Sequence, residues 1–340
     1  MSYVSYIKDK LGKYIKNTLR SDIILDREFL KSMGVSLDLA LEAREIVRGE
    51  TGQEVPGVRV DKETYDHATV TTVYIEDESA QAIMGKPVGK YITIEAPAIR
   101  ENDPDAHRQV AEVLAEQLKK MFDLPMESNI LVVGLGNWNA TPDALGPRVV
   151  DNCLVTRHLF NYAPQSLQGG MRPVSAIAPG VLGITGIETA EIVQGVTERV
   201  KPELIIAIDS LAARSVDRIA TTIQLADTGI NPGSGIGNKR AGINRETMGV
   251  KVIAIGVPTV ASAALIAQDA IEKYLKTTNT QIGVTNEAIK SVLEPFGGNL
   301  TVTPKEIDTL IEDTAHIIAG GISMALHPGV NPDDYAYYLH

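Results

Sequence analysis

The sequence predicts an α/β protein in which a mostly parallel central sheet is covered by helices on both faces. Three short apolar runs, 130–133, 204–208 and 250–257, are too continuous for half-exposed strands and favour strands buried on both faces. Patterns with helical spacing lie between these runs. Strands that alternate with helices favour parallel pairing, because each crossover needs room for a helix.

The N-terminal segment is amphipathic. Tyr3, Ile7, Leu11 and Tyr14 recur at helical spacing with lysines between them, which predicts a helix followed by a linker through Leu30. An ordinary docking helix and a removable regulatory segment both fit this pattern.

A strand-rich insertion is expected at about residues 56–99. The β-branched residues of HATVTTVYIE and KYITIEAP favour strands, and the tripeptide Gly-Lys-Pro at 85–87 marks a turn between them. Residues 105–122 then carry apolar side chains on one side at helical spacing, which predicts a helix.

The second half of the chain repeats the alternation. A helix is predicted at 187–200, and the residues after Asp209, SLAARSV, are also compatible with a helix. An alanine-rich helix through Tyr274 follows the third strand. The C-terminal segment, about 303–327, is predicted to be helical, with Thr303 as its N-cap. Because no repeat or low-complexity linker divides the chain, one catalytic domain is expected.

Composition excludes several classes of protein. The net charge of -11 and the lack of a basic stripe argue against direct binding of nucleic acid. A single cysteine, Cys153, allows neither an intrachain disulfide nor a cysteine-based zinc site. The sequence shows no secretory signal and no apolar stretch of membrane-spanning length, so a cytoplasmic location without membrane contact is expected.

Two aspartates are the candidate catalytic residues. Asp143 lies in the loop after the first strand, and Asp209 directly follows the second. Ligand sites of parallel sheets lie beyond the carboxyl ends of the strands, so the two side chains would face one cleft if their strands are neighbours. Close carboxylates do not both ionise easily, and such a pair can activate water and protonate a leaving amine. The alternative is that each aspartate caps a helix.

The loop around Asp143 supplies further candidates. Gly136, Asn137, Trp138 and Thr141 are predicted to line a substrate pocket, together with Ser210 after the second strand. Packing is the alternative role for Trp138, and Ser210 does not sit in a Gly-x-Ser-x-Gly elbow.

Other ligand-binding patterns are incomplete. Gly134-Leu135-Gly136 is similar to a dinucleotide fingerprint, but Asn139 occupies the third glycine position. The glycine-rich run 229–240 lacks phosphate-loop spacing and fits a loop that flanks the cleft, although it could hold an anion. No zinc-binding helix pattern is present among the histidines, so no zinc site of that kind is predicted.

Several long segments together resemble the germination protease family of spore-forming bacteria. The resemblance begins near residue 35 and is weaker between 60 and 125. It is carried by GLGNWNATPDALGP at 134–147, PGVLGITGIETAEI at 179–192, AIDSLAARSVDRIATTIQLADTGINPGSGIGNKR at 207–240, GVPTV at 256–260 and TPKEIDTLIEDTAHIIAGGISMALHPG at 303–329.

The resemblance implies an endopeptidase that degrades small acid-soluble DNA-coating proteins in the spore core, the forespore cytoplasm, during germination. It also implies a fold similar to that of hydrogenase maturation peptidases, a homotetramer, no cofactor and an atypical aspartic mechanism. The catalytic aspartates of the family match Asp143 and Asp209. One departure follows GVPTV, where Ala261 and Ser262 replace the expected valine and aspartate.

The resemblance further implies a self-processing zymogen. Asp38, Leu39 and Ala40 have the order acidic, apolar, small that the family cuts, which predicts a propeptide at 1–38 and a peptidase domain at 39–340. Glu28-Phe29-Leu30 is a weaker competing site because its third residue is not small.

Two other functions stay open from the sequence. A hydrogenase-maturation-type peptidase would need a metal-ligating side chain beside the glycine loop. A non-enzymatic module would use the loop at 229–240 to hold an anionic partner.

Overall fold

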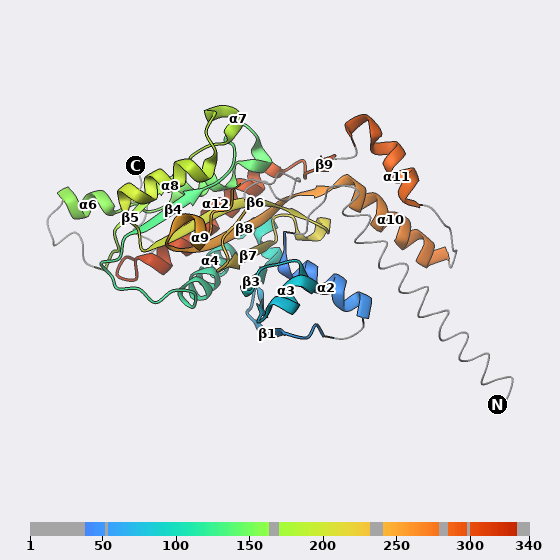
Figure 1. The fold of residues 1–340 in the computed structure, drawn as a ribbon, viewed down its shortest axis with the longest axis horizontal. Coiled ribbons are helices and arrows are strands. Elements are labelled where there is room, and N and C mark those ends of the chain that lie inside the picture. The colour runs from blue at the N-terminus through green and yellow to red at the C-terminus, as the bar shows by residue number, and fades with distance from the viewer. Residues whose placement is uncertain are drawn as a thin grey trace.

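A computed structural model of the chain describes residues 38–51, 54–162, 170–231, 241–278, 285–297 and 300–331 (Figure 1). The predicted N-terminal helix and most of the 229–240 loop lie outside these residues. Within them the strands join into one nine-stranded sheet of order β1-β2-β3-β7-β8-β6-β4-β5, with β9 paired to β8. The strands are β1 (Val58–Thr64), β2 (Thr69–Ile75), β3 (Gly89–Glu95), β4 (Ile130–Gly134), β5 (Val174–Ile177), β6 (Leu204–Ala213), β7 (Thr222–Ala226), β8 (Lys251–Ser262) and β9 (Thr301–Val302).

The α/β class is confirmed, with one refinement of the sheet. Strands β5, β4, β6 and β8 are neighbours and pair in parallel. Strand β7 returns beside β8 in the antiparallel sense, and β3, β2 and β1 continue the antiparallel part. The strands of the predicted insertion therefore extend the central sheet, because β3 finds its hydrogen-bonding partner in β7.

Helices cover both faces of the sheet. Ile206 and Ile208 of β6 pack in one apolar cluster with α4 and α12, whereas Ile205 and Ala207 of the same strand pack in another with α8 and α9. This division follows from the alternation of side chains along a strand. The helices are α2 (Ala40–Thr51), α3 (Glu78–Met84), α4 (Pro104–Lys119), α5 (Leu145–Asn152), α6 (Arg157–Tyr162), α7 (Leu182–Thr185), α8 (Thr189–Val200), α9 (Arg245–Met248), α10 (Ala263–Thr278), α11 (Thr285–Leu293) and α12 (Ile307–Leu326), with 3-10 turns η1 (Pro97–Arg100), η2 (Thr141–Asp143), η4 (Val216–Arg218) and η6 (Glu294–Phe296).

The helix predicted after Asp209 is wrong. Strand β6 continues through this aspartate to Ala213, because the long strand β8 supplies pairing partners along the whole stretch, with a shift of register between Leu211 and Ala212. Asp209 therefore lies inside a strand.

The predicted N-cap at Thr303 is also wrong. Helix α12 begins at Ile307, and the N-cap residue Glu306 makes no side-chain capping hydrogen bond. The Thr303 hydroxyl instead donates to the Thr259 carbonyl of β8 at 2.8 Å.

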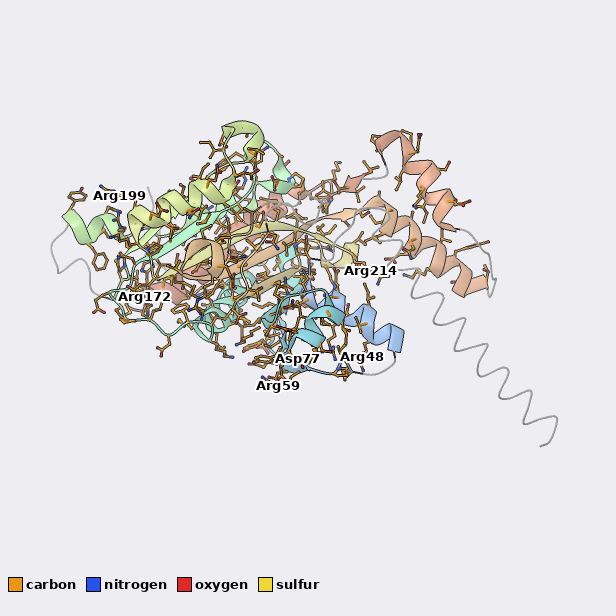
Figure 2. All side chains as sticks on the ribbon, viewed as in Figure 1. Arg48, Arg59, Asp77, Arg172, Arg199 and Arg214 are labelled. Atoms are coloured by element: carbon orange, nitrogen blue, oxygen red, sulfur yellow. The ribbon has the colours of Figure 1, made fainter. Side chains whose placement is uncertain are left out.

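Figure 2 labels one arginine near each end of the parallel strands. Arg172 precedes β5 and donates to the carbonyls of Leu124, Pro125 and Leu326, which fastens the amino ends of the strands to the chain around them. Arg214 directly follows β6, at the carboxyl ends. Among the described helices, none has an apolar stretch long enough to cross a membrane.

Candidate active site

Two glycines hold the loop after β4 against the start of α5. A Cβ atom at Gly134 would lie 2.1 Å from the Gly146 carbonyl oxygen, and one at Gly146 would lie 2.2 Å from the Leu135 oxygen. Only glycine permits this approach of two backbones. The glycines of the GLG motif thus bring the loop that carries Asp143 to the carboxyl end of the sheet.

Asp143 lies in this loop, half-buried in the turn η2. Its carbonyl accepts a hydrogen bond from the Asn137 N–H at 2.9 Å. Gly136 makes room for that contact, since it has φ of 119° and a Cβ there would lie 2.0 Å from the same carbonyl oxygen. The N-cap positions of η2 and α5 are Ala140 and Ala144, so Asp143 does not cap either helix.

Asp209 is buried in β6, only 6% exposed, and a strand position gives it no helix to cap. Burial raises the pKa of its carboxyl group well above the usual value, and the charges of Asp143 and Asp38 raise the pKa further. The Ser210 N–H opposes this by donating to Oδ1 at 2.9 Å. The two candidate aspartates are therefore close enough for the charge of Asp143 to raise the pKa of the Asp209 carboxyl group.

The other predicted pocket residues divide into two groups. Asn137, Trp138 and Thr141 share the Asp143 loop, and Trp138 is 48% exposed, with the Arg148 guanidinium 5.9 Å from its ring centre. Ser210 is adjacent to Asp209, so strand alternation directs its side chain to the opposite face of the sheet. Its buried hydroxyl has no hydrogen-bond partner among the described residues.

The junction at Asp38 and Leu39 lies beside these carboxylates. Both residues are buried, at 7% and 0% exposure. The Asp38 carboxylate accepts a hydrogen bond from the Ala212 N–H of β6 at 3.0 Å, and its charge contributes to the raised pKa of Asp209. The predicted cleavage site is thus in contact with the strand that carries a candidate catalytic residue.

Known proteins of one family are similar to this chain over most of its length. The family model described as germination protease matches residues 37–288 and 283–339. The chain belongs to the germination protease family. A germination protease of Caldanaerobacter subterraneus subsp. tengcongensis is 50% identical over 91% of this chain and 99% of its own, and one of Clostridium perfringens is 45% identical over 90% and 99%. Another, from Bacillus velezensis, is 43% identical over 90% and 97%.

One solved structure is a more distant match. The [NiFe] hydrogenase maturation protease HycI from Thermococcus kodakarensis KOD1 is 18% identical, with a TM-score of 0.34, over 62% of this chain and 98% of that one. Among the described residues of this germination protease family member, no group of three His, Cys, Asp or Glu side chains is placed to hold a metal ion.

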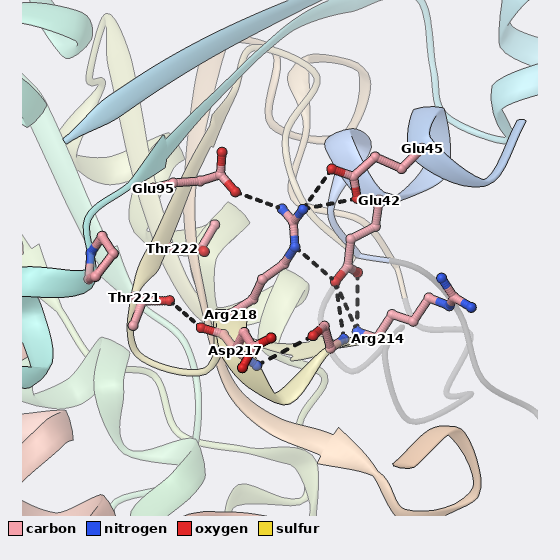
Figure 3. A pocket seen from close by; sticks show the side chains of 10 residues that line it. Glu42, Glu45, Glu95, Arg214, Asp217, Arg218, Thr221 and Thr222 are labelled. Carbon is pink, nitrogen blue, oxygen red and sulfur yellow. Dashed lines mark hydrogen bonds and ion pairs between the residues drawn. The ribbon is translucent and has the colours of Figure 1, made fainter. Parts of the chain in front are cut away.

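An ion-pair cluster fastens α2, the helix that follows the junction (Figure 3). The Arg218 guanidinium lies 2.8 Å from Glu45, 3.5 Å from Glu95 and 3.6 Å from Glu42. These side chains line a cavity of about 390 Å³. The cluster joins α2 to β3 and to the turn after β6, and so holds the start of the predicted peptidase domain against the sheet.

Glu42 is the most deeply buried carboxylate of this cluster. Its carboxyl group accepts hydrogen bonds from the backbone N–H groups of Arg214 and Ser215, at 3.1 to 3.4 Å. Burial raises the pKa of Glu42 to about 7, against the opposing effects of these hydrogen bonds and of Arg218.

Sequence reasoning missed four residues near the junction: Glu42, Lys86, Arg218 and Gln224. The sequence predicts only a turn at Lys86, and Gln224 lies in a strand that no sequence pattern singles out. Nothing in the local sequence distinguishes them, because their positions matter only once α2 and the junction before it pack against β2, β3 and α3 and hydrogen-bond to β7 and to the turn after β6.

Proposed function

We propose that this chain is an endopeptidase made as a zymogen, which cuts its own Asp38–Leu39 bond with Asp143 and Asp209. The observation that carries the proposal is the place of the junction: a bond of the predicted sequence type lies buried, with the Asp38 carboxylate close enough to raise the pKa of Asp209. Membership of the germination protease family supports peptide hydrolysis as the reaction.

The two carboxyl groups suit two different steps. Asp209 keeps its proton because it is buried beside a second acid. Half-buried Asp143 then acts as the base that takes a proton from water, while the water oxygen bonds to the carbonyl carbon of Asp38. When the carbon–nitrogen bond breaks, Asp209 gives its proton to the leaving nitrogen of Leu39. The products are a new carboxyl terminus at Asp38 and a new amino terminus at Leu39, and the proton has passed from Asp209 to Asp143.

The proposal extends to other substrates once residues 1–38 have left. The place of the junction is then free for an acidic residue followed by an apolar one in another polypeptide. The family resemblance makes small acid-soluble spore proteins the proposed substrates, the spore core the proposed location and a homotetramer the proposed assembly.

Sequencing of the amino terminus tests the self-processing step. Purified full-length wild type, Asp143→Asn and Asp209→Asn are incubated under activating conditions, with the exposed Asp217→Asn as a matched control. We expect a Leu39 terminus in the wild type and the control, and an intact Met1 in both active-site variants, because an amide preserves shape but does not exchange the proton. Thermal unfolding checks that each variant is folded.

Four outcomes would contradict the proposal. An active enzyme that retains Met1 would show that the chain is not made as a zymogen. Normal cleavage by a folded aspartate variant would show that the substituted aspartate has no role in the mechanism. Inhibition by EDTA that added metal reverses would favour the metal-dependent maturation-type peptidase instead. A chain that binds partners but cleaves no peptide would favour the non-enzymatic module.

A further inference from the structure

Two side chains donate hydrogen bonds to one carbonyl oxygen, that of Asp38. The Lys86 ammonium group lies 2.9 Å from this oxygen and the Gln224 side-chain amide nitrogen lies 3.1 Å from it. This is the carbonyl of the bond between Asp38 and Leu39. The donors come from segments far apart in the sequence, and neither belongs to the carboxylate pair.

Gln224 is fixed at both ends of its amide group. While its nitrogen donates to the Asp38 carbonyl, its oxygen accepts from the Ala40 N–H at 2.7 Å. The side chain therefore spans Leu39 and holds the backbone on both sides of it. An amide that is used in this way does not rotate, so its donor remains directed at the carbonyl.

The sheet places Gln224 on the same face as Asp209. Asp209 of β6 is paired with Gly256 of β8, and Gly256 is paired with Gln224 of β7. Paired residues of neighbouring strands project to the same side, so these three positions form one row across the sheet. The carboxyl group lies at one end of the row and the amide donor at the other, and the middle residue has no side chain.

Lys86 approaches from the layer above that face. It follows α3, where Gly85 adopts a left-handed conformation with φ of 68° and turns the chain. The residue is half-buried, and burial lowers the pKa of its ammonium group while the charges of Asp38 and Glu42 raise it. A lysine placed in this way offers a concentrated positive charge at short range to the Asp38 carbonyl.

We propose that Lys86 and Gln224 form the oxyanion-binding site of this peptidase. The inference rests on the proposed function, since it assumes that the Asp38–Leu39 bond is cut. When the water oxygen bonds to the carbonyl carbon, the π electron pair moves to the carbonyl oxygen, which becomes negatively charged. Both donors already lie at the distances at which oxyanion-stabilising groups act. When the carbon–nitrogen bond breaks, the pair returns to form the carbonyl, and the donors again hold a neutral oxygen.

The same site accounts for an acidic residue before the cut. The Asp38 carboxylate accepts from the Ala212 N–H at 3.0 Å and lies within the field of the Lys86 charge. After residues 1–38 leave, the two donors and the Ala212 N–H are free to receive the corresponding groups of a second substrate.

The first experiment measures self-cleavage of full-length chains. Wild type, Lys86→Met, Lys86→Gln and Gln224→Met are compared by the rate at which the Leu39 terminus appears. Loss of one oxyanion donor typically slows catalysis about 100- to 1000-fold, which is the expected effect of Lys86→Met and Gln224→Met. Lys86→Gln keeps a neutral donor and should be intermediate. Lys90→Met is the matched control, because this half-buried lysine on β3 makes no contact with the junction in the described structure, and it should cleave at the wild-type rate.

The second experiment distinguishes a catalytic role of Lys86 and Gln224 from a role that only holds residue 38 in place. Processed chains, with slow variants brought to completion by a trace of wild type, are given a synthetic peptide with the junction sequence VSLDLALEA. For this peptide we expect the Lys86 and Gln224 variants to have a lower kcat than wild type, by about the factor that slows their self-cleavage. Residues 1–38 are absent from processed chains, so a residue that only fastens Asp38 would leave kcat normal, and that result would overturn the inference.

The outcomes also distinguish this inference from the proposed function. If the wild type cuts at Leu39 and the aspartate variants do not, wild-type rates in folded Lys86 and Gln224 variants overturn the oxyanion site alone. If the wild type never cuts this bond, both proposals fail. Because the two donors are substituted separately, and Lys86 at two severities, a single variant that fails to fold still leaves the other measurements decisive.

Discussion

The raised pKa of Asp209 depends on where the residue lies and not on its type. A solvent-exposed aspartate is ionised at neutral pH. Here burial is the largest cause that raises the pKa of this carboxyl group, and the charge of Asp143 is the next. The same two residues in an open loop would both be ionised, and neither would have a proton for a leaving amine.

The raised pKa of Asp209 predicts a pH-dependent difference in stability. The folded state binds this proton more tightly than the unfolded state, so the contribution to stability is complete below the unfolded pKa and is lost as pH rises through the folded pKa. Asp209→Asn does not titrate and removes this loss. We therefore expect the free energy of unfolding of Asp209→Asn to rise relative to that of wild type from about pH 4 upward.

Urea unfolding at several pH values measures this difference, on chains whose amino termini are verified as intact. Asp143→Asn serves as the comparison, since it removes the nearby charge but leaves Asp209 buried. In this variant the pKa of Asp209 should be raised by less than in wild type. Stability curves of wild type and Asp209→Asn that run parallel across the pH range would show that the carboxyl group titrates normally.

Helix α2 shows how one element positions the Asp38–Leu39 bond, the bond that we propose is cut. The helix begins directly after the junction, and the Arg218 cluster ties it to the turn that follows β6. The Arg218 side chain is 13% exposed and Glu42 is 2% exposed, so removal of the guanidinium leaves a buried carboxyl group without its counter-charge.

We predict that Arg218→Met lowers the free energy of unfolding by on the order of 2 kcal/mol and slows self-cleavage. The reason is that α2 loses its attachment and the junction is held less firmly. Urea unfolding and the rate of appearance of the Leu39 terminus measure the two effects. Arg108→Met is the control: this arginine makes an exposed pair with Glu112 on α4 and should lose less than about 0.5 kcal/mol. Equal losses in both variants would contradict the structural role of the cluster.

In the fold as a whole, helix α12 completes the apolar core. Helix α12 packs on α4 and α5, under the parallel strands that carry the site. Two adjacent glycines of α12 differ in their surroundings. A Cβ atom at Gly321 would lie 2.8 Å from Leu114 Cδ2 and 3.0 Å from the Ala111 carbonyl oxygen, whereas one at Gly320 would meet nothing nearer than 3.8 Å.

These neighbours provide a matched pair of variants. Gly320→Ala should stabilise the protein by up to about 1 kcal/mol, because alanine favours a helix and the site has room. Gly321→Ala should destabilise it by about 1 to 3 kcal/mol, because the added methyl group separates α12 from α4. Thermal and urea unfolding measure both. The same sign of change in the two variants would show that the helices are not in close contact at Gly321.

Local patterns were enough to predict the buried strands at 130–133 and 204–208, the helix α4 and the candidate residues Asp143 and Asp209. Each of these depends on a pattern or a motif within one short segment, and burial of a strand or helix leaves its periodicity in that segment. The tertiary structure alone decided that β3 pairs with β7, that Asp209 lies within a strand, and that Lys86 and Gln224 meet at one carbonyl. Such contacts join segments that are far apart in the sequence, and no local pattern records them, because they arise from the path of the chain through the fold.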